Sequence, residues 1–126
     1  MDMKVIATAE DAAQLLAATW PDGAAETIAV LHLDSEGRML GRSEHPGDAD
    51  AVDLPLRAII AEALRLDASG MIVAHNHPSG DPTPSSEDVE ATRILAETAR
   101  RLDIRLVDHL IFGGDGCSSF RALGLL

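Results

Sequence analysis

The spacing of hydrophobic positions along the chain predicts alternating helices and strands. Alanine- and leucine-rich or helically spaced segments predict helices over residues 9–20, 56–66 and 85–102. Shorter apolar runs bounded by turn residues predict strands over residues 26–34, 38–43, 71–74, 104–112 and 118–121. Polar, proline- and glycine-containing segments predict loops at residues 21–23, 45–53, 77–84 and 113–116. The pattern therefore indicates an α/β fold, a single domain in which helices flank a mixed β-sheet.

Two histidines follow the most apolar of the predicted strands, the uninterrupted run at residues 71–74. His75 and His77 are two positions apart, so both imidazoles point to the same side of an extended chain. Pro78 favours extended geometry at His77 and helps to keep the two rings aligned. Two parallel imidazoles can begin a zinc site, although an isolated pair with this spacing is also typical of surface loops.

Asp88 adds a carboxylate to the histidine pair. At about 100° per residue, Asp88 falls on the apolar stripe of its predicted helix, together with Ala91, Thr92, Leu95, Ala99 and Leu102. An unpaired carboxylate in such a place is costly, and a metal ion would neutralise it. The alternative interpretation is that Ser85 and Asp88 form a capping pair at the start of the helix.

Two imidazoles and one carboxylate give three protein ligands, which leave a fourth tetrahedral position for water. This arrangement is typical of a catalytic zinc, which lowers the pKa of bound water toward about 7 and polarises a carbonyl. Hydrolysis also needs a general base to take the proton of that water. The residues alone leave five glutamates open for this role: Glu10, Glu26, Glu36, Glu44 and Glu62.

Composition bears on partners and compartment. The 126 residues include 10 Lys and Arg against 21 Asp and Glu, a net charge of −11, and neither half of the chain is basic. Nucleic acid is therefore not an expected partner, because phosphate contacts need a basic face. Cys117 is the single cysteine, expected to be half-buried and inert. Without an internal disulfide, a leader or an apolar run of about 20 residues, we expect a cytoplasmic protein that does not span a membrane.

The order of His75, His77, Ser85 and Asp88 matches the JAMM motif of the MPN-type (JAB) metalloproteins without a gap. The wider text, residues 75–81 with Pro84-Ser85, Asp88 and residues 106–109, resembles the RadC branch of JAB domains in particular. The resemblance runs from about Glu26 to Gly124. It implies an MPN/JAB-like core over residues 26–126, with a cytidine-deaminase-like layered architecture, preceded by a helix and turn over residues 1–25 of the same single domain.

The resemblance also implies a function. Glu26, eight residues before Asp34, becomes the general base, and one Zn²⁺ per chain is held by His75, His77 and Asp88. Ser85 would donate a hydrogen bond to the oxyanion or to the bound water during cleavage of a peptide or isopeptide amide in an unidentified protein or peptide substrate. Asp108 and His109 also match the family, but we interpret them as structural residues at a strand end, since the metal already has three ligands.

Two other classes of function stay open beside the hydrolase. The domain could be a non-catalytic, metal-binding interaction module, or a nuclease or accessory protein associated with DNA repair. The oligomeric state is open as well.

Overall fold

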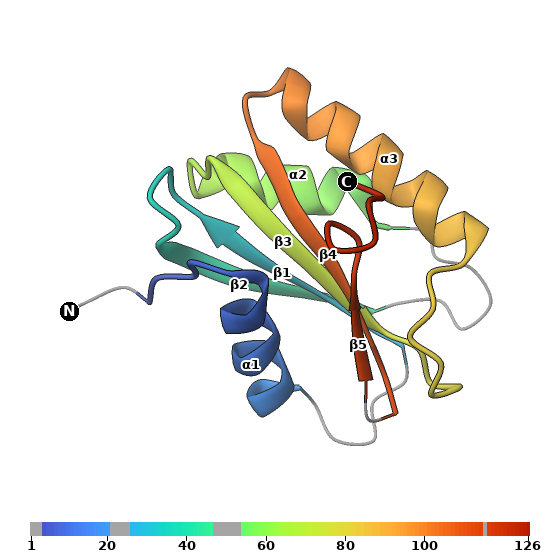
Figure 1. The fold of residues 1–126 in the computed structure, drawn as a ribbon. Coiled ribbons are helices and arrows are strands. Elements are labelled where there is room, and N and C mark those ends of the chain that lie inside the picture. Colours follow the sequence, from blue (N-terminus) through green and yellow to red (C-terminus); the bar gives the residue numbers. More distant parts are fainter. Residues whose placement is uncertain (1–3, 21–25, 47–53, 115) are drawn as a thin grey trace.

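Five strands form one mixed sheet in the spatial order β2-β1-β3-β4-β5 (Figure 1). The computed structural model describes residues 4–20, 26–46, 54–114 and 116–126. Its elements are α1 (Ala9–Thr19), β1 (Thr27–Leu33), β2 (Met39–Pro46), α2 (Leu56–Arg65), β3 (Gly70–Asn76), α3 (Ser86–Arg101), β4 (Arg105–Gly113) and β5 (Gly116–Ser119). All neighbouring strands are antiparallel except β3 and β4, which are parallel and are connected through α3. The predicted α/β class is confirmed.

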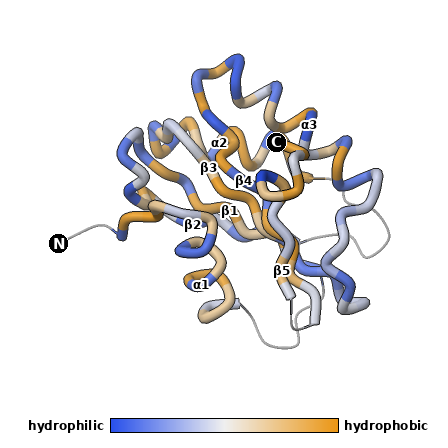
Figure 2. The backbone as a smooth tube through the Cα atoms, in the orientation of Figure 1, coloured by the Kyte–Doolittle hydropathy of each residue, from blue (hydrophilic) through white to orange (hydrophobic). Residues whose placement is uncertain are grey.

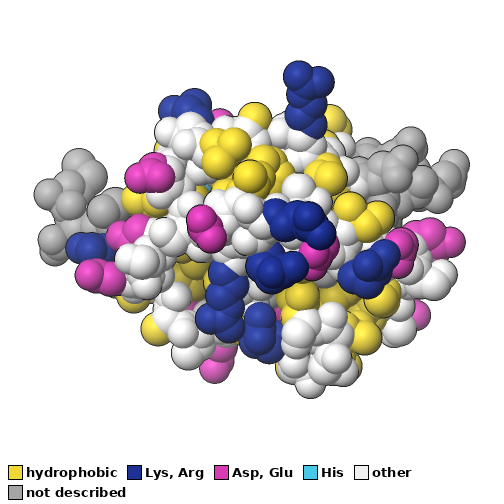
Figure 3. Space-filling view, turned by 90° about the horizontal axis from the view of Figure 1, so that it is seen from above, with side chains coloured by type: hydrophobic (Ala, Val, Ile, Leu, Met, Phe, Trp, Pro, Cys, Tyr) yellow, Lys and Arg dark blue, Asp and Glu magenta, His cyan; other side chains and the backbone are white. Residues whose placement is uncertain are grey.

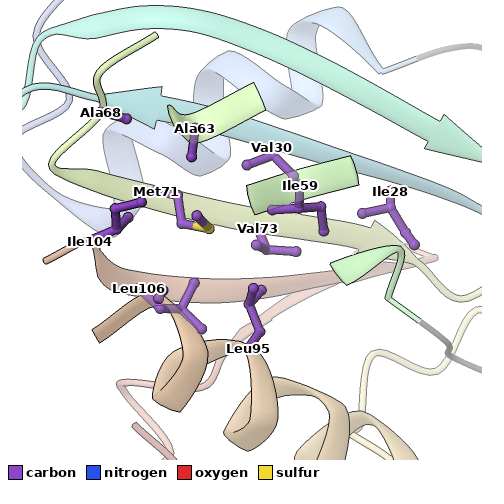
Figure 4. Close-up of a cluster of buried hydrophobic side chains, with 11 residues drawn as sticks. Ile28, Val30, Ile59, Ala63, Ala68, Met71, Val73, Leu95, Ile104 and Leu106 are labelled. Carbon is purple, nitrogen blue, oxygen red and sulfur yellow. The ribbon is translucent and has the colours of Figure 1, made fainter. Parts of the chain in front are cut away.

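Helices cover both faces of this sheet. On one face α1 packs Ala12 and Leu16 against β1, β3 and β4. On the other face α2 and α3 pack Ile59 and Leu95 against the side chains that β1, β3 and β4 point toward them (Figure 4). The central strands are accordingly mostly hydrophobic along the backbone trace, whereas many loop segments are polar (Figure 2). The resulting three layers hold β3 in the middle of the molecule.

Several predicted boundaries shift in the structure. β2 continues to Pro46 because its register with β1 runs as far as Thr27, so His45 lies in a strand and not in the expected loop. β3 includes His75, which the sequence pattern places just beyond its end. Leu102 is 43% exposed because α3 ends one residue before it, so the buried apolar stripe of this helix does not extend to Leu102. The loop expected at residues 21–23, and most of that expected at 45–53, lie outside the described residues.

A β-bulge interrupts the pairing of β3 with β4. Met71 is opposite Leu106, but the next residue, Ile72, is opposite Asp108, so Val107 is an extra residue in β4. The N–H of His109, just after the bulge, donates to the Asp108 carboxylate at 2.7 Å. The bulge is thus stabilised by the side chain beside it.

The bulge changes the face on which the second half of β4 presents its side chains. Beyond it His109 lies opposite Val73, which faces α2 and α3. With regular pairing His109 would lie opposite Ala74, whose side chain belongs to the cluster under α1. The bulge therefore places His109 on the same face as His75, and Asp108 and His109 lie within β4 and not at a strand end as expected.

Candidate metal centre

Three side chains meet where β3 ends and α3 begins. His75 is the penultimate residue of β3, His77 follows the strand, and Asp88 lies in the first turn of α3. The His75 and His77 Nε2 atoms are 3.0 Å apart. The Asp88 oxygens lie 3.4 Å from His75 Nε2 and 3.2 Å from His77 Nε2. These potential ligand atoms all lie within 4.8 Å of one another, so the three residues could hold a metal ion.

Asp88 caps the helix and also faces the histidines. Its Oδ2 accepts from the Ser85 N–H at 2.8 Å, while the Asp88 N–H donates to Ser85 Oγ at 3.1 Å. The capping interpretation is therefore correct, and it leaves the other carboxylate oxygen unused. Asp88 Oδ1 is buried without a hydrogen-bond partner among the described residues. The capping pair thus aims an unsatisfied oxygen into the cluster.

The electrostatics of Asp88 favour its ionised form. Burial by itself raises the pKa of this carboxyl, but the close approach of His75 and the hydrogen bond from the Ser85 backbone outweigh burial and hold the pKa well below its ordinary value. The side chain is completely buried, so its negative charge calls for a neighbouring cation.

His77 is oriented by a backbone carbonyl. Its Nδ1 lies 2.8 Å from the Asp81 carbonyl oxygen. A carbonyl can only accept, so Nδ1 carries a proton and Nε2 is the ring nitrogen that faces Asp88. An imidazole nitrogen beside a buried carboxylate is a pair of ligands that fits a divalent cation.

A close backbone approach fixes the loop that carries Asp81. A Cβ at Gly113 would lie 2.8 Å from the Pro82 nitrogen and 2.9 Å from the Asp81 carbonyl carbon, so only glycine leaves room for the loop there. The His77 N–H donates to the Phe112 carbonyl at 2.7 Å. The Asp81 carboxylate accepts from the N–H and the hydroxyl of Thr83, so its side chain stabilises the turn of this loop. The end of β4 therefore holds the His77 loop in place.

A second layer of buried polar residues lies behind His75. His75 Nδ1 is 2.7 Å from His109 Nε2, and His109 Nδ1 is 2.6 Å from Thr92 Oγ1. The His109 ring stacks on Phe120 with ring centroids 4.6 Å apart. Burial lowers the pKa of His109 well below its ordinary value. No pattern in the sequence indicates this contact, because regular alternation along β4 would send His109 to the other face.

Glu26 lies at the edge of the same region. It immediately precedes β1 and is 8% exposed. Ile28 is opposite His75, so continuing the antiparallel register by two residues brings Glu26 opposite His77. Among the other four glutamates, Glu36, Glu44 and Glu62 pair with arginines and Glu10 is exposed on α1. Position therefore favours Glu26 over the alternatives, and its role as a base stays a prediction.

A group of arginines lies near the end of α3 that is opposite to Asp88. Arg100, Arg105 and Arg121 line a pocket of about 390 Å³ where α3 ends and β4 begins. Arginine side chains gather among apolar ones on this face (Figure 3).

Cys117 is exposed on β5, not half-buried as expected, because β5 is an edge strand. Within the described residues, no helix has the length and hydrophobicity needed to cross a membrane.

Comparison with known proteins agrees with this geometry. The family model described as "RadC-like JAB domain" matches residues 6–125. A UPF0758 protein of Roseiflexus castenholzii is 39% identical over 116 residues, which cover 91% of this chain and 50% of that protein. A UPF0758 protein of Rhodobacter capsulatus is 43% identical over 102 residues, covering 80% and 48%. The chain thus spans about half the length of these curated relatives.

Proposed function

Because the chain belongs to the family of RadC-like JAB domains, we propose that it is a zinc-dependent hydrolase of the JAMM type that cleaves a peptide or isopeptide amide. The observation that carries the proposal is the meeting of His75, His77 and the unsatisfied Oδ1 of Asp88. Three protein ligands, rather than the four of a closed structural zinc site, leave room for a reacting molecule. His77 is 17% exposed, so the cluster opens toward solvent on its side.

Each of the surrounding residues has a role in this proposal. Zn²⁺ bound by the two histidines and Asp88 would lower the pKa of a coordinated water to about 7 and polarise the substrate carbonyl. Glu26 would accept one proton from the attacking water and deliver it to the leaving amine, so that the amide becomes a carboxylic acid and an amine.

Ser85 would stabilise the negative charge that develops on the carbonyl oxygen. Its Oγ already accepts the Asp88 N–H, so its own proton is not used in the helix cap. Hydrogen-bond donors of this kind contribute about 3 kcal/mol to transition-state stabilisation.

Metal analysis tests the site. We expect about one Zn²⁺ per chain in the wild-type protein, measured by plasma mass spectrometry after dialysis, and little in His77→Ala. The matched control is His45→Ala, which removes a histidine of β2 that belongs to no metal-binding group among the described residues. Equal zinc content in His77→Ala and the wild type would contradict the proposed ligand set.

Turnover tests the base. Glu26→Gln should retain zinc and lose at least 100-fold in hydrolysis of a fluorogenic peptide library or a lysine-linked isopeptide, the lower range for general-base catalysis. Glu36→Gln is the control, because Glu36 is an exposed partner of Arg38. Undiminished turnover in Glu26→Gln would exclude it as the base.

A further inference from the structure

The buried chain His75–His109–Thr92 has one consistent arrangement of protons, and it begins at Thr92. The Thr92 hydroxyl lies 2.7 Å from the Asp88 backbone carbonyl and 2.6 Å from His109 Nδ1. A carbonyl oxygen can only accept, so the single hydroxyl proton must point to Asp88. Thr92 Oγ1 is then an acceptor toward the ring, and the proton between Thr92 and His109 belongs to His109 Nδ1.

The proton on His109 Nδ1 determines the next contact. The His109 ring is completely buried and stacks on Phe120, surroundings that favour a neutral imidazole. A neutral ring with a proton on Nδ1 has a lone pair on Nε2, and that atom is 2.7 Å from His75 Nδ1. A hydrogen bond of this length needs one proton, which His75 Nδ1 must supply.

The arrangement ends at the metal centre. With the proton on Nδ1 donated to His109, the other ring nitrogen of His75 is Nε2, the atom that lies 3.0 Å from His77 Nε2 and 3.4 Å from Asp88 Oδ1. We propose that Thr92 and His109 are positioning residues that hold a proton on His75 Nδ1, so that Nε2 is the atom of this ring able to bind a metal. The residues behind His75 thus do for one ligand what the Asp81 carbonyl does for His77.

The proposal deepens the proposed function, since it rests on the same metal centre, but its first test needs no metal. Long-range ¹H–¹⁵N spectra of the metal-free protein distinguish a protonated from an unprotonated ring nitrogen. We expect His109 to be protonated on Nδ1 alone and His75 to carry a proton on Nδ1. A wild-type protein in which His75 Nδ1 is unprotonated, in all or part of the molecules, would overturn the proposal even if zinc binds tightly.

The second test uses a variant that leaves all three ligands in place. Thr92→Val keeps the shape of the side chain and removes the acceptor for His109. We expect the fixed tautomer of His75 to be lost and zinc affinity, measured by competition with a chelator, to fall about 10–100-fold, the usual effect of losing such a supporting contact. Thr92→Ser keeps the hydroxyl and should restore both readouts.

Thr98 offers a matched control on the same helix. Its hydroxyl donates to the Ile94 carbonyl four residues earlier at 2.8 Å, as Thr92 does to Asp88, and among the described residues no hydrogen bond joins it to a histidine. Thr98→Val should leave the tautomers and zinc affinity unchanged. If Thr92→Val binds zinc within threefold of Thr98→Val and keeps the wild-type spectrum, the proposal is wrong. If Thr92→Val does not fold, the metal-free wild-type spectrum decides alone.

Failure of this inference and failure of the proposed function are distinguishable. A wild-type protein with the expected tautomers that binds no zinc supports the positioning role of Thr92 and His109 and contradicts the metalloenzyme. A wild type that binds zinc but lacks the proton on His75 Nδ1 in its metal-free form supports the metalloenzyme and contradicts the positioning role of Thr92 and His109.

Discussion

Two groups of two histidines and a carboxylate lie in this domain, and they use their nitrogen and oxygen atoms differently. In the first, the Nε2 atoms of His75 and His77 face each other and the Asp88 carboxylate. In the second, His32 of β1 and His45 of β2 each lie 3.1 Å from the Ser43 hydroxyl, which separates them. Among the described residues only the first group brings its ligand atoms to one point.

The carboxylates of the two groups differ in the same way. Glu62, whose charge acts on His32 and His45, is bound by Arg65 at 2.5 Å. Asp88 has no lysine or arginine within 4.0 Å among the described residues, and its Oδ1 has no hydrogen bond. Residue types alone therefore do not define a metal site in this domain. The candidate site differs in that its potential ligand atoms face one point and its carboxylate lacks an arginine partner.

The largest expected effect comes from exchanging one carboxylate in each group. Asp88→Asn retains an oxygen for the Ser85 N–H and removes the charge that a metal would neutralise. We expect zinc affinity, measured by isothermal titration or chelator competition, to fall by more than the roughly 100-fold typical of supporting residues. Glu62→Gln should leave zinc affinity unchanged, and an equal loss in both variants would remove the distinction between the two groups.

A smaller effect is expected from the backbone contact that supports only the first group. A methyl group at Gly113 meets backbone atoms of Asp81 and Pro82 within 3 Å, so Gly113→Ala must displace the loop that orients His77. We expect zinc affinity to fall about 10-fold, within the range for losing an outer contact. Gly116→Ala is the matched control, because the nearest side-chain atom to a methyl there would be Pro82 Cγ, at 3.5 Å. Equal affinities in the two variants would show that the loop tolerates displacement.

Removing the hydroxyl at the centre of the second group should affect stability and not metal binding. Ser43→Ala takes away the contact shared by the His32 and His45 rings. We expect a loss of about 0.5–1.5 kcal/mol in the free energy of unfolding, the net contribution of a typical hydrogen bond. Chemical denaturation measures the loss. A change in zinc stoichiometry in this variant would mean that the second group also takes part in metal binding.

The smallest effect is a pH dependence of stability from His32. Burial lowers its pKa below the ordinary value of 6.5, and Glu62 offsets this only in part. The unfolded chain therefore binds a proton at higher pH than the folded protein. Stability is fully present above pH 6.5 and falls as pH decreases from 6.5 toward the lowered folded pKa. His32→Gln should show a shallower decline in urea unfolding between about pH 7 and 5, and an identical slope would contradict this assignment.

Local signals in the sequence predicted much of the fold and of the candidate site. The apolar run of β3, the capping residues of α3 and the spacing of His75, His77 and Asp88 each depend on neighbours in the chain, so they could be read from it. Other features depend on pairing between distant segments. The extension of β2 to His45 follows from its register with β1, and the exposure of Cys117 follows from the place of β5 at the sheet edge.

His109 shows most clearly why the remainder could not be predicted. Its contact with His75 depends on a register shift against β3, and no periodic pattern along β4 records such a shift. Strict alternation from Leu106 assigns His109 to the face under α1. The sequence therefore suggested a structural strand residue where the structure has a partner of a potential ligand.

The extra residue in β4 separates the length of the strand from the direction in which its side chains point. Because Val107 is absorbed in the bulge, Leu106 and His109 pair with Met71 and Val73, which are only two positions apart in β3. Deleting Val107 would leave the same two pairs joined by a regular ladder, so His109 would keep its face, whereas losing the bulge with Val107 retained would turn His109 toward α1. In aligned sequences of this family, a one-residue gap at Val107 is therefore compatible with the same contact between His109 and His75.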